Sequence, residues 1–117
     1  MYKSIKRTLK SRQVGLVKTY HLISGTAATP ADSGLDKAFV SSVVDNGVGS
    51  WTITVIEPSR LDLVVDSLIP VTSGRILRVS AVTKDSVTIT AVNDAGVAAD
   101  ADFYLGLVHS TLLDTLF

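Results

Sequence analysis

The chain has 117 residues, enough for one domain with one core, and 46% of them are hydrophobic whereas only 19% are charged. It contains no cysteine, which excludes disulfides, a thiolate nucleophile and zinc–thiolate sites. No apolar run approaches the about 18 residues that a membrane-spanning helix needs, so we expect no membrane partner.

Charge is unevenly distributed along the chain, although the net charge is zero. Six bases and no acid precede Asp32, whereas the remaining residues carry five bases and eleven acids. We expect residues 1–13 to form a basic arm, because such an arm can be steered onto an acidic subunit or partner. No apolar block follows the arm, which argues against a secretory signal. The bases expected to contact a partner are Lys3, Lys6, Arg7, Lys10 and Arg12.

Residues that favour β-strands begin directly after the arm. The first predicted strand covers residues 14–23, and the small and polar residues 24–34 predict a loop after it. A second strand is expected over residues 39–44. Asp45-Asn46-Gly47 then predicts a hairpin turn, because Asn and Gly tolerate the positive φ that such turns require.

The rest of the domain alternates between apolar and polar residues. The return strand over 50–56 ends before Pro58, while residues 61–68 fit either a strand or a short helical turn. Further strands are expected over 75–82, 86–92 and 102–108. Tight turns are expected at Lys84-Asp85 and at 93–96. The residues expected on the buried faces are Trp51, Ile53, Val55, Val87, Ile89, Ala91, Phe103, Leu105 and Leu107.

About six to eight short strands at roughly ten-residue spacing predict an all-β fold. We therefore expect residues 14–109 to form a small antiparallel β-sandwich or barrel, jelly-roll-like in character. The high apolar fraction favours a surface that is partly covered by partner subunits over an unusually apolar core.

The final residues differ from the strands. Residues 110–117 place large apolar side chains at the spacing of one helical face, yet a segment this short does not hold a helix alone. We expect this apolar C-terminal tail to bury itself on the domain or on a neighbouring chain. The residues expected to do so are Leu112, Leu113, Leu116 and Phe117.

Few residues suggest chemistry. His21 and His109 lie in predicted strands and are read as ordinary strand histidines. The acids Asp94, Asp100 and Asp102 resemble a loop that could bind a hard cation, but their spacing is not that of an EF-hand, and a solvated turn is favoured. We expect no enzyme, cofactor or metal. The basic arm makes nucleic-acid binding a less favoured alternative, since few aromatic residues accompany it.

Two stretches carry a resemblance, GVGSWTITVIEP at residues 47–58 and SVTITAVNDAGVAADADFYLGLV at residues 86–108. Their texture of a strand, an Asp/Gly turn and a final apolar strand resembles small virion proteins of tailed bacteriophages. Such segments occur in β-sandwich or β-barrel units of capsid decoration (cement) proteins and of tail or fibre components.

The resemblance implies a non-enzymatic structural protein of the virion, assembled in the host cytoplasm. A decoration protein that bridges capsid subunits is the leading hypothesis, with a homo-oligomer, expected to be a trimer, and the major capsid protein or other virion proteins as partners. A tail or fibre component, either an adaptor or a receptor-binding tip, is the alternative. An enzyme is the least favoured class, because no constellation of catalytic residues is visible.

Overall fold

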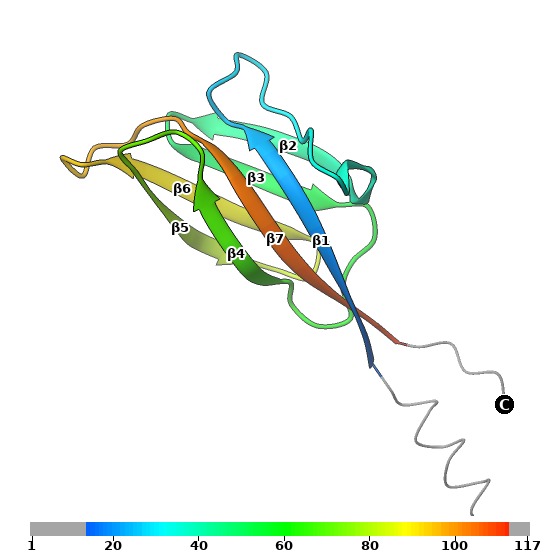
Figure 1. Cartoon of the computed structure of the whole chain (residues 1–117). Helices are drawn as coiled ribbons and strands as arrows, with labels where there is room; N and C mark the ends of the chain where they lie inside the picture. The colour runs from blue at the N-terminus through cyan, green and yellow to red at the C-terminus, as the bar shows by residue number, and fades with distance from the viewer. Residues whose placement is uncertain (1–13, 113–117) are drawn as a thin grey trace, which may run out of the picture.

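The computed structural model describes residues 14–112, with side chains for residues 15–110. These residues form an antiparallel β-sandwich, which confirms the all-β prediction and its sandwich form (Figure 1). The three-stranded sheet has the order β1-β7-β4, and the four-stranded sheet has the order β2-β3-β6-β5. The strands are β1 (Val14–Ser24), β2 (Val40–Gly47), β3 (Ser50–Val55), β4 (Val64–Pro70), β5 (Arg75–Val82), β6 (Ser86–Asn93) and β7 (Asp102–Leu112).

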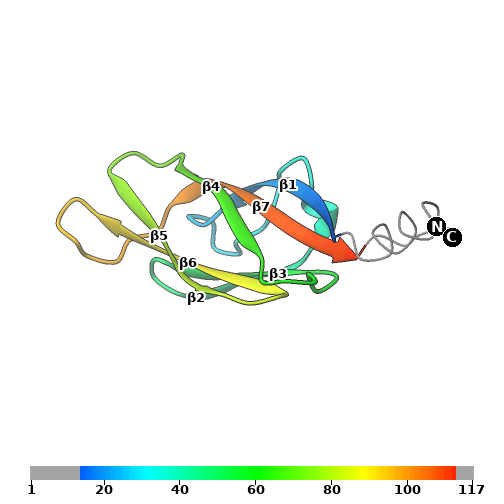
Figure 2. The same cartoon turned by 90° about the horizontal axis from the view of Figure 1, so that it is seen from below.

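The two sheets lie as layers over one another, as Figure 2 shows. Strands β1 and β7 pair antiparallel along their whole length, from Val14 opposite Leu112 to Ser24 opposite Asp102. The described chain therefore begins and ends at the same end of the sandwich. At the opposite end lie the start of loop 25–36 and the β6–β7 connection, so the molecule has two different poles.

The core lies between the sheets and follows the predicted alternation. All nine residues expected on the buried faces are buried. Trp51 and Phe103 meet in its middle, with ring centroids 5.2 Å apart and planes tilted by 54°. The indole N–H of Trp51 has no hydrogen-bond partner among the described residues. The core is therefore held by apolar packing from both sheets.

The first hairpin turn lies further along the chain than predicted. Strand β2 continues through Asp45 to Gly47, and the turn falls on the next two residues, Val48 and Gly49. Gly49 has a φ of 71°, and a Cβ there would lie 2.5 Å from the carbonyl oxygen of Ala91. Gly47 also has a positive φ, of 121°, as the sequence predicted, but only glycine fits at Gly49, where a positive φ coincides with so close a neighbour.

Two further boundaries also differ from the prediction. Strand β4 begins at Val64, and the described residues 61–68 form no helical turn. Strand β7 runs past the expected end at 108 to Leu112, because β1 offers backbone partners down to Val14. Residues 110–112, expected to open a helical tail, are therefore strand. The short 3-10 turn η1 (Lys37–Phe39) is the helical piece of residues 14–112. Within that range no helix has the length and apolar character needed to cross a membrane.

Candidate functional site

The edge of β1 divides into a covered half and an uncovered half. Loop 25–36 covers the half from Tyr20 to Ser24, where the Tyr20 amide donates to the Asp36 carboxylate at 2.6 Å. The amide of Ser33 donates to the carbonyl of Leu22 at 2.9 Å. Because even-numbered residues of β1 direct their backbone groups to this edge, the next such residues are Leu16 and Lys18. No described residue pairs with the backbone groups of those two on this side.

Beneath the loop, a line of polar side chains joins β1 to Asp32. One oxygen of Asp32 lies 2.5 Å from Nδ1 of His21, and Nε2 of that ring lies 2.7 Å from the hydroxyl of Thr19. The other Asp32 oxygen accepts the amides of Leu22 and Gly34, at 3.2 and 2.8 Å. Thr19 and His21 are only 3% and 2% exposed.

The order of these groups assigns their protons. An ionised carboxylate only accepts hydrogen bonds, so Nδ1 of His21 carries the proton toward Asp32. In the neutral ring, Nε2 then accepts from the hydroxyl of Thr19. Hydrolases use an acid, an imidazole and a hydroxyl in such a line to activate a nucleophile. Here the three side chains are buried, and the carboxylate also accepts backbone amides of the loop and of β1. The network therefore holds loop 25–36 against β1.

The two histidines do not meet. His21 lies opposite Leu105 in the β1–β7 register, whereas His109 lies opposite Val17, four residues or about 13 Å further along. Nε2 of His109 lies 2.8 Å from the carbonyl oxygen of Glu57, to which its N–H donates.

The three acids of the 94–102 region also act separately. Asp100 accepts the amide of Gly49, and Asp102 accepts the amide and hydroxyl of Thr26. Asp94 lies in a turn closed by the side chain of Asn93. Among residues 14–112 no three potential metal ligands cluster.

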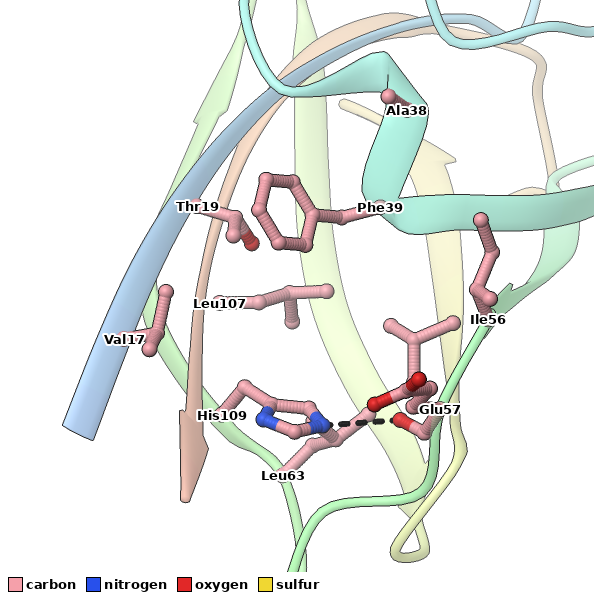
Figure 3. Close-up of a pocket in the computed structure, with 10 residues that line it drawn as sticks. Val17, Thr19, Ala38, Phe39, Ile56, Glu57, Leu63, Leu107 and His109 are labelled. Carbon is pink, nitrogen blue, oxygen red and sulfur yellow. Dashed lines mark hydrogen bonds between the residues drawn. The ribbon is translucent and has the colours of Figure 1, made fainter. Parts of the chain in front are cut away.

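An apolar cavity of about 390 Å³ opens at the uncovered half of the β1 edge. Figure 3 shows Val17 and Thr19 on one side of it, and Phe39 and Ile56 across from them. His109 lies at its lower part, where the hydrogen bond to Glu57 satisfies the ring N–H. Val17, Phe39 and Ile56 are large apolar side chains that remain exposed at its rim. The sandwich is therefore incompletely closed at this corner.

The outer face of the three-stranded sheet is apolar and aromatic. Leu16 is 70% exposed and Tyr104 is 51% exposed, although both lie in regular strands. The Ser67 hydroxyl lies over Gly106 in the centre of this face, where a Cβ would be only 2.5 Å from it, and Lys18 and Asp66 form an ion pair at 3.4 Å. We call this surface the outer face; its exposed apolar residues are Leu16, Tyr20, Val64, Ile69 and Tyr104.

The opposite surface of the sandwich has a different character. On β3 and β6 of the four-stranded sheet, the residues that alternate with the core are serines and threonines, apart from Val92 near the end of β6. These outward residues are Ser50, Thr52, Thr54, Ser86, Thr88 and Thr90. The flanking strands β2 and β5 of this sheet expose Val44 and Ile76. This surface is therefore polar in its centre, whereas every strand of the outer face carries exposed apolar residues, which suits contact with another protein.

Most of the site residues predicted from the sequence lie outside the described residues. This holds for the arm residues Lys3 to Arg12 and for Leu113, Leu116 and Phe117. Of the expected tail, the backbone of Leu112 is described, as the last residue of β7 opposite Val14.

Sequence reasoning did not single out the outer face, the Asp32–His21–Thr19 line or the cavity. One signal was available for the outer face: residues 14–23 are apolar at even as well as odd positions, which a strand with one solvated face does not need. The other two features join segments distant in sequence. Comparison with protein-family models, curated proteins and solved structures gives no match.

Proposed function

We propose that this chain is a non-enzymatic structural protein of a tailed-phage virion, a capsid decoration or cement protein that bridges capsid subunits. The observation that carries the proposal is the outer face, an exposed apolar and aromatic surface on a rigid sheet. Contiguous surfaces of this kind on small domains are typical of protein–protein contacts. The resemblance of residues 86–108 to small virion proteins supplies the biological setting.

The two poles of the sandwich fit this role. The basic arm precedes Val14 and the rest of the predicted apolar tail follows Leu112, and these two residues are paired at one pole. Both extensions are thus attached where they can reach the same neighbouring chain, while the outer face begins at Leu16, beside their attachment points. A β body with contacts at one pole and along one face is suited to bridge adjacent subunits of a shell. Multivalent placement on a symmetric shell would strengthen weak individual contacts.

Sedimentation of the purified chain with emptied capsids and with isolated tails of its phage tests the proposal. We expect the chain to sediment with capsids. The double variant Leu16→Lys/Tyr104→Lys should lose this binding, because it places two charges in a desolvated contact. The matched control Val44→Lys/Ile76→Lys alters exposed apolar residues of the other sheet and should bind as the unmodified chain does.

Two results would contradict the proposal. Binding to neither particle would contradict a role in the virion. Undiminished binding of Leu16→Lys/Tyr104→Lys would show that the outer face is not the contact surface. Binding to tails in place of capsids would favour the alternative, a tail or fibre component.

A further inference from the structure

We infer that the apolar cavity beside β1 receives residues 113–117 of a second copy of this chain, added as an extended strand along the uncovered half of the β1 edge. This inference concerns contacts between copies and does not depend on the proposed role in a virion.

The cavity requires an apolar occupant. Two of its polar groups are already engaged, since the His109 ring donates to the Glu57 carbonyl and the Thr19 hydroxyl is hydrogen-bonded to His21. The side chain of Glu57 is exposed to solvent. The remaining surface comes mainly from aliphatic and aromatic side chains, including the exposed Phe39 and Ile56 at the rim. A mainly apolar occupant would leave few polar groups without partners there.

The backbone beside the cavity can accept a strand. Leu16 and Lys18 direct amide and carbonyl groups to the open side of β1, and no described residue bonds them there. An added strand would complete these hydrogen bonds, and every second side chain of that strand would enter the cavity.

Residues 113–117, Leu-Asp-Thr-Leu-Phe, match these requirements. In an extended segment, Leu113, Thr115 and Phe117 lie on one side, which would face the cavity and its rim, so two of the three side chains there are large and apolar. Leu116 lies on the other side, where it would adjoin the exposed Leu16 of the outer face. The basic arm fits the cavity less well, because charged residues separate its few apolar ones.

Residues 113–117 cannot occupy the cavity of their own chain. Strand β7 passes the cavity at Leu107 and His109 and leads away from it toward Leu112. Reversing the chain takes a turn of about four residues, and five residues span at most about 18 Å even when extended. Too little of 113–117 would remain to run back along β1. A second copy, approaching from outside, has no such constraint, and mutual exchange around a symmetry axis produces closed oligomers.

Disulfide cross-linking tests the inference directly, because the natural chain contains no cysteine. Full-length Ile56→Cys, carrying an affinity tag, is mixed with untagged Phe117→Cys and mildly oxidised. We expect a tagged–untagged dimer that is strongly enriched over the matched control, in which Val97→Cys replaces Ile56→Cys. Val97 is similarly exposed but lies in the β6–β7 connection at the other pole (Figure 1).

Three results would overturn the inference. The first is a dimer yield equal to that of the Val97→Cys control. The second is a double variant Ile56→Cys/Phe117→Cys that closes its disulfide within one chain, which would assign the cavity to the chain's own tail. The third is cross-linking by Leu9→Cys in place of Phe117→Cys, which would assign it to the arm.

A second measurement covers the case in which a cysteine disturbs packing. In sedimentation equilibrium, the unmodified chain should exceed the 12.4 kDa monomer mass as its concentration rises. Leu113→Ser/Phe117→Ser should lose this increase while keeping the same thermal unfolding transition. An unchanged increase in mass would contradict the inference.

Discussion

At the scale of single residues, the buried Asp32 determines how loop 25–36 lies on the sandwich. It accepts three hydrogen bonds, two from backbone amides and one from His21, and its side chain is only 4% exposed. Gly34 shows how tightly the loop is seated, since a Cβ there would lie 2.5 Å from the amide nitrogen of Leu22. The loop is thus positioned by one carboxylate and one close backbone approach.

Asp32→Ala should lower the free energy of unfolding by about 2–4 kcal/mol, because it leaves buried donors without a partner. Asp32→Asn should cost less, since the amide keeps one acceptor and His21 can change tautomer to accept from it. Urea unfolding followed by the fluorescence of the single, buried Trp51 measures both. Asp94→Asn, at an exposed turn, is the control and should stay within about 0.5 kcal/mol. Equal losses for Ala and Asn would contradict this account of the hydrogen bonds.

The sequence could not identify this residue. Asp32 stands in a stretch of small and polar residues that reads as solvated loop, and its partners are ten or more positions away on β1. The buried residues of the strands could be predicted from the sequence, because the alternation of apolar and polar residues involves only neighbouring positions in the chain. A carboxylate that fastens a loop depends on the path of that loop, which no local pattern describes.

At the scale of elements, the connection from β3 to β4 closes the pole where Val14 and Leu112 lie. Its Ser59 is buried against Ser110 of β7, with the two hydroxyls 2.9 Å apart. Ser59 also accepts the Ser110 amide at 2.8 Å, and its own amide donates to the carbonyl of Lys84 in the β5–β6 turn. One segment therefore ties the two sheets together below the cavity.

Ser59→Ala should reduce the free energy of unfolding by about 1–3 kcal/mol, because the amide of Ser110 would stay buried without an acceptor. Denaturant titration gives the value. Ser73→Ala, at an exposed position, serves as the matched control and should change little. A loss for Ser59→Ala no larger than for Ser73→Ala would mean that water replaces the missing hydroxyl.

Predicted and observed elements agree best where alternation is long. Strands β3, β5 and β6 start at the predicted residues, and in β3 and β6 the apolar and polar residues alternate cleanly. The ends of β2 and β7 were misjudged for different reasons. Asp45 and Asn46 carry turn chemistry but stay in β2, where Asn46 bonds the hydroxyl of Thr52. The extension of β7 depends on β1, which the sequence of β7 alone cannot reveal.

At the scale of the whole molecule, the charge separation between arm and body should govern binding more than folding. Serine replacement of the five arm bases should weaken capsid binding and leave the melting temperature of the body nearly unchanged. Exposed charges contribute little to folding, but together they can anchor the arm to an acidic surface. The variant carries all five changes: Lys3→Ser, Lys6→Ser, Arg7→Ser, Lys10→Ser and Arg12→Ser.

Calorimetry and co-sedimentation at two salt concentrations measure these effects, because screening should weaken the native arm in the same direction. Arg78→Ser/Lys84→Ser removes exposed bases from the body and controls for charge in general. A melting temperature lowered by many degrees would show that the arm belongs to the folded body. Loss of a duplex DNA gel shift in the arm variant would favour the nucleic-acid alternative.

The pairing of β1 with β7 has a mechanical consequence. Force applied through the two ends would act on Val14 and Leu112, which lie opposite one another at one pole. The hydrogen bonds of an antiparallel pair run across the strands, so this load would break them in succession, as in unzipping, and not all at once, as in shear. The fold therefore resists tension poorly between Val14 and Leu112. In an assembly, tensile load would be carried better by contacts along the outer face, because many hydrogen bonds between its three strands would then bear the load at the same time.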